Sequence, residues 1–396
     1  MPAGTKRLDS LTSLRYFAAL AVVLCHVNPY FLSNLWQRDT ISYGYVGVSF
    51  FYLLSGFVLT WSCAEQPATR FWWRRFARIW PLMAVMMTVA YTALWNRELH
   101  PGSAGGWLAQ VFLLQAWDPN TSVRTGGDGP AWSLSCEMFF YAAFPLLIRW
   151  VGRLRARGVA LAAAATVAAM IIAPLVTHVN AAEYYWLFYY LPGYRICEFI
   201  IGMLLARAVR LGLRIRYPSL GYLVALAGLA LWAWGIADAT VRDHGTNVGR
   251  PWVALLALPS LALLVLARAS ADLDGRARLL GRRLPVLLGT WSFALYLVHD
   301  VLSFLVSEHG WLSAHGKPGG VGDLVAFIAC ATALAALAHY AIERPAERWL
   351  RAHRPGRDGL LARLARLARR WRVPAAPGVP APRGVSVAGS TAKRSP

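Results

Sequence analysis

The sequence predicts an all-α fold, a polytopic membrane helical bundle of about ten transmembrane helices with both chain ends in the cytoplasm. Of the 396 residues, 57% are hydrophobic and 15% are charged, whereas soluble domains usually carry about 25% charged residues. The apolar residues form blocks of about 20 residues, the length that crosses the hydrocarbon core of a bilayer. The basic residues concentrate in alternate segments between these blocks, as cytoplasmic loops do.

Ten apolar blocks are long enough to cross a bilayer. They cover residues 12–30, 44–62, 77–95, 132–150, 158–177, 186–206, 219–237, 252–268, 286–305 and 322–342. The first block is expected to be a permanent helix, because the bulky stretch 27–36 after it offers no signal-peptidase site. The apolar stretch 107–117 is too short to span, so it is expected to be a re-entrant or interfacial helix.

The orientation of the bundle follows from the positions of Lys and Arg. If residue 1 is cytoplasmic, 32 of the 40 Lys and Arg residues lie in inside segments and six lie in outside segments. An odd number of spans would break this alternation, so the pattern predicts an even number and two cytoplasmic termini. Because cytoplasmic loops account for the net charge of +21, nucleic acid is not an expected partner.

The last residues differ from the rest of the chain. Residues 351–396 form a basic cytoplasmic tail in which 359–372 repeat Leu and Arg at helical spacing. This pattern suits an amphipathic helix on the anionic inner leaflet, or equally a partly ordered, solvated segment. Residues 373–396 are rich in Pro, Gly, Ala and Ser, which is typical of disorder. The five cysteines lack paired or metal-like spacing, so neither a disulfide framework nor a metal site is expected.

Ionisable side chains inside membrane spans are costly, so they are candidate functional residues. Arg15 and His26 lie eleven residues apart in the first span, which places them on one helix face about 16 Å apart along the axis. Glu137 of the fourth span is expected at the depth of His26, and a carboxylate beside a neutral histidine suits a general base. The alternatives are that Arg15 snorkels to the inner headgroups, that His26 makes a structural hydrogen bond, and that Glu137 pairs with an arginine.

Two further spans carry ionisable side chains. His299 and Asp300 lie in the outer part of the ninth span, and because adjacent residues point to different helix faces, at most one is expected to meet His26. Arg195 lies one helical turn from Glu198 in the sixth span. A mutually satisfied ion pair is the simplest interpretation of that spacing.

The inner loop 70–78 is dense in guanidinium groups, which suit phosphate oxygens. The interpretation left open beside a phosphate site is an ordinary positive-inside cluster. The predicted anion-binding residues are Arg15, Arg74, Arg75 and Arg78. Small polar groups at the start of the fourth span, Ser133 and Ser135, are further candidates to line a site, as is Ser55.

Several of these segments resemble the membrane-bound acyltransferase-3 family. The first span, SLTSLRYFAALAVVLCH, is similar to the opening helix of that family, in which an Arg precedes a His by eleven positions. Five more segments resemble its motifs in the same order: residues 44–60, 74–82, 132–147 with Glu137, 292–299 with His299, and 340–349. Asp9 lies further before Arg15 than the family's acidic residue usually does, and Cys136 stands where an aliphatic residue is common.

The resemblance implies a membrane acyltransferase domain over residues 8–350 that moves an acyl group, often acetyl, from acyl-CoA to a hydroxyl. The acceptor would be a sugar, a glycolipid, a cell-wall polymer or a natural product, and the protein would be multi-pass in a bacterial plasma membrane. The expected partners are the bilayer, acyl-CoA as donor substrate and the acceptor, with no bound cofactor. His26 would deprotonate the acceptor or carry the acyl group, and Glu137 would orient His26.

Two other classes of protein use buried His, Glu and Arg in the same way. A proton-coupled transporter or exporter of a polar or acylated metabolite would need two compartments, whereas an enzyme releases free CoA without a gradient. A membrane sensor or scaffold would tolerate replacement of His26 and Glu137.

Overall fold

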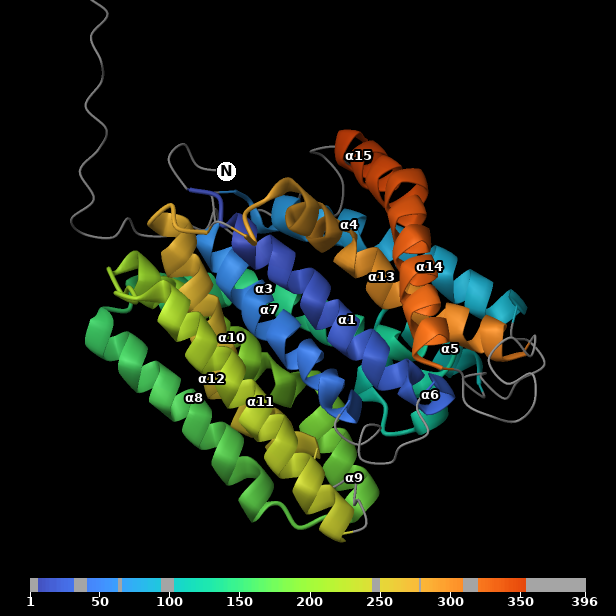
Figure 1. Cartoon of the computed structure of the whole chain (residues 1–396), viewed down its shortest axis with the longest axis horizontal. Coiled ribbons are helices and arrows are strands. Elements are labelled where there is room, and N and C mark those ends of the chain that lie inside the picture. Colours follow the sequence, from blue (N-terminus) through green and yellow to red (C-terminus); the bar gives the residue numbers. More distant parts are fainter. Residues whose placement is uncertain are drawn as a thin grey trace, which may run out of the picture.

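The computed structural model describes residues 6–31, 41–62, 66–93, 103–243, 250–277, 279–308 and 320–353. Every regular element within these ranges is helical, which confirms the all-α fold (Figure 1). Each of the ten predicted blocks overlaps one long helix. The long helices are α1 (Asp9–Phe31), α3 (Val46–Trp61), α4 (Ala68–Ala93), α7 (Trp132–Arg153), α8 (Ala156–Val176), α10 (Pro192–Arg210), α11 (Pro218–Asp243), α12 (Arg250–Leu273), α13 (Arg283–Glu308) and α14 (Val321–Ala338).

Seven helices in the described ranges are long and apolar enough to cross a membrane, namely α1, α3, α7, α8, α12, α13 and α14. The first half of α4 carries four arginines, α10 holds Arg195 and Glu198, and the apolar part of α11 that is described covers only 218–234. These three helices therefore do not qualify by composition and length. The chain is a multi-pass membrane protein, while ten crossings with both ends in the cytoplasm stay a prediction.

The sixth long helix begins later than the sequence predicts. Instead of starting at residue 186, α10 begins at Pro192, after the short helix α9 (Ala181–Tyr185) and a π-helical segment, Trp186–Tyr190. Leu191 is extended, with φ −61° and ψ 121°, because a residue before proline avoids the helical region. The aromatic ring of Tyr190 then packs against Trp132 at the start of α7, with 4.6 Å between ring centroids.

Residues 103–117 form a hairpin that packs against α4 and α7, while its re-entrant or interfacial placement in the membrane stays a prediction. The first arm of the hairpin is α5 (Ala104–Val111). The chain reverses near Leu113, whose φ of 56° is left-handed. The indole Nε1 of Trp80, midway along α4, donates to the Val111 carbonyl at 3.2 Å. Trp117 packs on Phe139, about two turns inside α7, with 5.1 Å between ring centroids. The hairpin leaves apolar side chains exposed, at Leu108, Phe112 and Leu114.

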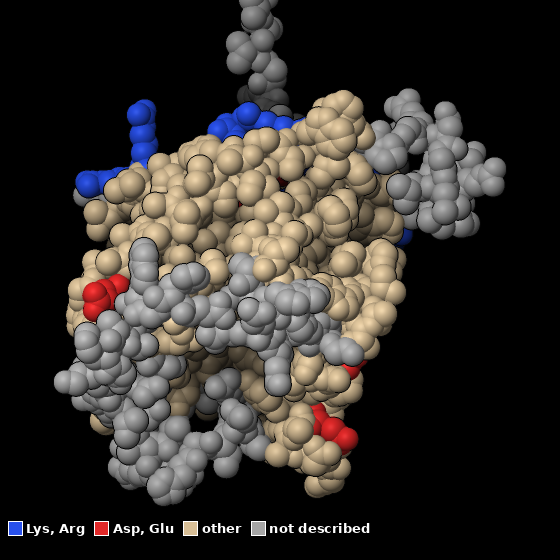
Figure 2. Space-filling model, turned by 90° about the vertical axis from the view of Figure 1, so that its right-hand side faces the viewer, with Lys and Arg blue, Asp and Glu red and all other residues tan. Residues whose placement is uncertain are grey.

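The segments that are predicted to be cytoplasmic meet at one end of the bundle. Lys6 Nζ donates to the Leu273 carbonyl at 2.9 Å, and Trp61 Nε1 donates to the Lys6 carbonyl at 3.2 Å. Arg210 donates to the Trp61 carbonyl at 2.8 Å. In Figure 2 most of the visible Lys and Arg lie along the upper edge, at the end where α1 begins in Figure 1, and the visible Asp and Glu lie lower. This separation of charge is the pattern expected of the two sides of a membrane protein.

Glycine permits two close helix contacts that position the site. Gly289 of α13 lies against the backbone of Thr12 in α1, where a Cβ would collide with the Thr12 carbonyl. Gly202 of α10 lies in the same way against the backbone of α3 at Leu53. Because α1 and α13 touch near their N-terminal ends, their C-terminal halves also lie side by side, which brings His26 to His299.

The end of the described chain is helical. From α14 the chain continues through a π-helical segment, His339–Glu343, into α15 (Arg344–Ala352). The predicted amphipathic helix at 359–372 and the predicted disorder at 373–396 lie outside the described residues. Cys25, Cys136, Cys197 and Cys330 are free thiols.

Candidate active site

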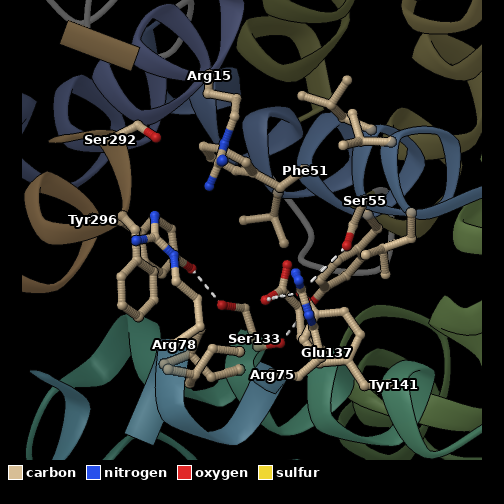
Figure 3. Close-up of a pocket in the computed structure, with 18 residues that line it drawn as sticks. Arg15, Phe51, Ser55, Arg75, Arg78, Ser133, Glu137, Tyr141, Ser292 and Tyr296 are labelled. Carbon is tan, nitrogen blue, oxygen red and sulfur yellow. Dashed lines mark hydrogen bonds between the residues drawn. The ribbon is translucent and has the colours of Figure 1, made fainter. Parts of the chain in front are cut away.

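A cavity of about 140 Å³ opens between α1, α3, α4, α7 and α13 (Figure 3). Its apolar lining comes from α3, α4, α7 and α13, and includes Phe51, Ile79, Leu134 and Phe293. Its polar lining consists of Arg15, Ser55, Arg75, Arg78, Ser133, Glu137, Tyr141, Ser292 and Tyr296. The cavity therefore collects four of the predicted charged residues from three helices that are far apart in the sequence.

Arg15 reaches into the cavity from α1 (Figure 3). The first turn of α1 is anchored by Asp272 of α12, whose carboxylate accepts from the Ser10 backbone N–H at 3.1 Å. In the described part of the chain Arg15 makes neither a hydrogen bond nor an ion pair, and its electrostatic neighbours include Arg78 and Glu137. A half-buried guanidinium in this setting has its donors available to an anionic ligand.

Arg75 is the second cavity arginine without a carboxylate in contact. Its guanidinium lies over the rings of Phe71, at 5.7 Å, and Tyr141, at 6.0 Å. Its buried Nε has no hydrogen-bond acceptor among the described residues. The aromatic faces attract the cation, but they leave its Nε–H without an acceptor.

Arg78 differs from the other two because two carboxylates neutralise it. It forms ion pairs with Glu343 and, at 3.3 Å, with Glu347. Glu343 also accepts from His339 Nδ1 at 2.9 Å. These contacts join α4 to the π-helical segment after α14 and to α15, so Arg78 is neutralised at this side of the cavity rather than offering a free charge.

Glu137 faces the cavity and not His26. Its Oε2 accepts from the Tyr141 hydroxyl at 3.1 Å, and Tyr141 lies 3.4 Å from the Ser55 hydroxyl. Arg15, Arg75 and Arg78 all contribute favourable electrostatic interactions to this carboxylate. Tyr141 was not among the predicted residues, although its position four residues after Glu137 already places the two on one helix face.

His26 pairs with His299. The Nδ1 of His26 lies 3.0 Å from Nε2 of His299, and Nδ1 of His299 lies 3.2 Å from the Leu295 carbonyl. A carbonyl only accepts, so His299 carries its proton on Nδ1 and offers the lone pair of Nε2 to the Nδ1–H of His26. In neutral His26, this chain of hydrogen bonds places the free lone pair on Nε2. His26 is exposed, whereas His299 is fully buried.

Tyr296 and Ser133 separate the histidine pair from the cavity. The two hydroxyls lie 2.8 Å apart, and both line the cavity (Figure 3). On its other side Tyr296 packs near His299, with 6.0 Å between ring centroids. The cavity thus ends one side chain below the histidine pair, and His26 itself does not line it.

Three predicted site residues lie outside this arrangement. Ser135 accepts from the backbone N–H of Ala116 at 3.3 Å and so holds the hairpin of residues 103–117. Arg195 is buried in an ion pair with Glu198 at 3.1 Å. Arg74 does not line the cavity, and partial burial, followed by the charges of Arg351 and Arg70, lowers the pKa of its guanidinium.

A multi-pass membrane protein that joins a guanidinium-lined cavity to a histidine base has the parts needed for group transfer from an anionic donor. Residues 8–342 match the acyltransferase domain of the acyltransferase-3 family. The chain therefore belongs to this family, and it is an O-acyltransferase.

The chain is similar to known acyltransferases over different fractions of its length. It is 35% identical to the acyltransferase MdmB of Streptomyces mycarofaciens, over 90% of this chain and 95% of the relative. It is 28% identical to the peptidoglycan O-acetyltransferase OatA of Listeria monocytogenes, over 37% of this chain and 25% of OatA. The O-acetyltransferase OatA of Staphylococcus aureus is 26% identical over 36% of this chain and 25% of that protein. No solved structure matches the chain.

Proposed function

We propose that this protein moves a short acyl group, such as acetyl, from cytoplasmic acyl-CoA to a hydroxyl of an acceptor, with His26 as the general base. The observation that carries the proposal is the cavity in which Arg15 and Arg75 lack carboxylate partners and which ends below the His26–His299 pair. Residues 8–350 would form the catalytic domain, in a bacterial plasma membrane with both termini inside. The contacts among Lys6, Trp61, Arg210 and Leu273 at one end of the bundle support that topology.

The size of the cavity supports a small acyl group. Its volume of about 140 Å³ equals that of about five water molecules in the liquid. A thioester with a short acyl chain and the end of the pantetheine arm would fill this space, so the nucleotide of the donor would remain at the cytoplasmic rim. Arg15 and Arg75 would bind the donor, and Arg74 at the rim would contact its phosphates.

Transfer begins when Nε2 of His26 takes the proton of the acceptor hydroxyl. The acceptor oxygen attacks the thioester carbonyl carbon, the C–S bond breaks, and CoA leaves as a thiolate that then takes a proton. His299 holds His26 in the tautomer with a free Nε2. Because Tyr296 and Ser133 lie between the cavity and His299, we expect their hydrogen bond to open as the thioester moves outward.

The relatives suggest which acceptors to try. One is named a peptidoglycan O-acetyltransferase, so a cell-wall polymer is a candidate acceptor beside sugars, glycolipids and natural products. Comparing the metabolites and envelope glycans of a deletion strain with those of the parent strain would identify the molecule that loses an acyl group.

The test is release of free CoA by purified protein in detergent with acetyl-CoA and that acceptor. His26→Ala is expected to lower the rate by about 100-fold or more, because a general base contributes about that much. His178→Ala is the matched control, since His178 is exposed at the end of α8 and outside the site. Full activity of a folded His26→Ala protein would remove His26 from the mechanism.

A further inference from the structure

A second hollow, which we call the α8–α10 groove, lies between these two helices. Its volume is about 490 Å³, and the residues that line it are all apolar. They include, from α8, Ala156, Val159, Ala160 and Ala163, and from α10, Leu204 and Leu205. Because alanine side chains end at Cβ, the two helices pack here without filling the space between them. The groove therefore has room for an apolar chain that the protein itself does not supply.

The α8–α10 groove faces the bilayer rather than the interior of the protein. The helix α8 is long and apolar enough to cross a membrane, and only 17% of its apolar stretch is buried. It lies at the edge of the bundle (Figure 1), and Ala160 in the groove lining is exposed. An apolar groove offers water no hydrogen-bond partner, so in a membrane it is filled by hydrocarbon. A lipid chain is therefore the occupant that this lining fits.

The groove begins at the end of the bundle that is predicted to be cytoplasmic. Ala156 is the first residue of α8, and Leu213, which also lines the groove, follows the end of α10. Arg210 in the last turn of α10 donates to the Trp61 carbonyl at 2.8 Å, where the predicted cytoplasmic segments meet. From Ala156 to Ala163 the groove extends about 10 Å along α8, about a third of the hydrocarbon core. An acyl chain in it would thus start directly below the lipid headgroups.

Four arginines adjoin this end of the groove, and all are exposed: Arg153, Arg155, Arg157 and Arg214. The first three lie within three residues of Ala156, and the fourth directly follows Leu213. In the described part of the chain the side chains of Arg155 and Arg157 make neither a hydrogen bond nor an ion pair. Neither 138–182 nor 199–237 contains Asp or Glu, so the segments that form the groove supply no carboxylate. A phosphate is the anion that suits these guanidinium groups.

We propose that the α8–α10 groove binds one anionic phospholipid of the cytoplasmic leaflet, with an acyl chain in the groove and the phosphate at Arg155 and Arg157. The cytoplasmic leaflet carries the anionic lipids, and basic pockets between membrane helices on that side bind their headgroups. The lipid fills the space that the alanines of α8 leave, so it stabilises the packing of α8 on α10. This binding is independent of acyl transfer and of the role of His26.

The test measures lipid binding to the full-length protein in detergent by native mass spectrometry. The probes are phosphatidylglycerol, which is anionic, and phosphatidylcholine with the same acyl chains, whose own ammonium group faces the arginines unfavourably. The wild type is expected to bind one phosphatidylglycerol about 10-fold more tightly than phosphatidylcholine, because arginines at the membrane surface attract anionic lipid. Thermal unfolding of the same samples should move to higher temperature with phosphatidylglycerol.

Two variants separate the headgroup contacts from the chain contacts. Arg155→Gln with Arg157→Gln removes the headgroup contacts, so the affinity for phosphatidylglycerol should fall about 10-fold, to that for phosphatidylcholine. Ala160→Phe places a ring in the groove, so both lipids should bind more weakly. If Ala160→Phe fails to fold, the arginine variant decides alone, since its two changes lie at exposed side chains.

Each variant has a matched control that should bind both lipids as the wild type does. Arg282→Gln with Arg283→Gln removes two exposed arginines at the start of α13, and Ala169→Phe adds a ring at an exposed alanine of α8 outside the groove. Equal affinity of the wild type for the two lipids, or unchanged phosphatidylglycerol binding in the arginine variant, would overturn the proposal. A smaller oligomer of Ala160→Phe in gel filtration, with lipid binding unchanged, would also overturn it and would assign the groove to a second copy of the chain.

Discussion

Two arginine–glutamate sets lie in the same bundle and differ in their burial and in their contacts with each other. Arg195 and Glu198 lie one turn apart on α10, 3.1 Å from each other and 2% and 1% exposed. Arg195 also donates to the Ser49 hydroxyl at 3.2 Å and lies over the Tyr52 ring at 5.1 Å. Arg15 and Glu137 come from different helices, form no ion pair in the described structure, and face a cavity.

The difference separates charged side chains that stabilise the fold through an ion pair from charged side chains that face a cavity and can bind a ligand. Two opposite charges in direct contact offset much of each other's desolvation inside the protein, so removal of one is felt in stability. An arginine left open to a cavity has its donors satisfied only when an anion binds, so its removal is felt in activity. Residue type alone does not separate the two cases, whereas burial and the partners do.

The largest effect is expected at the ion pair of Arg195 with Glu198. Arg195→Met should lower the free energy of unfolding by about 3–5 kcal/mol, because Glu198 is left buried without its cation. The double change Arg195→Met with Glu198→Leu should recover much of that loss, since it removes both charges. Unfolding in detergent with increasing denaturant measures both variants against the wild type.

Stability of Arg195→Met close to that of the wild type would contradict the structural role of this pair. The acyltransferase activity of the double variant provides the control. Activity close to that of the wild type in a folded double variant would place Arg195 outside the chemistry, as its absence from the cavity lining indicates.

The next effect is expected at the open arginine. Arg15→Gln should lower kcat/KM for acetyl-CoA by about 10- to 100-fold, the equivalent of one lost hydrogen bond to a charged group. Its unfolding free energy should change less than that of Arg195→Met, because Arg15 forms no ion pair in the described structure and Glu137 keeps the charges of Arg75 and Arg78 nearby. Arg15→Lys should restore only part of the activity, since an ammonium lacks the planar fork of guanidinium.

The measurement is the donor dependence of CoA release, with thermal unfolding recorded on the same samples. Arg74→Gln is a useful comparison, because Arg74 does not line the cavity. If Arg15→Gln unfolds the protein while its donor dependence stays unchanged in the folded fraction, the contrast between the two sets is wrong.

The sequence predicted the helices better than it predicted the partners. Every block found from apolar length became a long helix, because a bilayer span leaves the backbone no alternative. The late start of α10 escaped prediction, since Leu191 and Pro192 interrupt an apolar run without changing its composition. The depth argument placed His26 near Glu137, but depth does not fix rotation about the helix axis, and the contact of α1 with α13 turned His26 toward His299.

Spacing within one helix was informative where spacing across helices was not. The ion pair of Arg195 with Glu198 follows from three residues of separation on one helix. The neutralisation of Arg78 by Glu343 joins residues from α4 and from the end of α14, and no local pattern indicates it. The burial of Asp128 could not be predicted either, because an aspartate in the loop before a span gives no signal of burial.

The smallest effect is expected at Arg78, which lines the cavity as Arg15 does and forms ion pairs as Arg195 does. Glu343→Gln removes one of its two carboxylate partners and leaves Glu347, 3.3 Å away. Arg78 should then attract the anionic donor more strongly, and KM for acetyl-CoA should fall by up to about fivefold, the range of a partly exposed ion pair. The fall should shrink as salt is raised from low to physiological ionic strength, because salt screens the added charge. A KM that rises instead would mean that Glu343 orients Arg78 for the donor. Arg78 would then resemble Arg195 in forming an ion pair, but it would act in donor binding rather than in holding the fold.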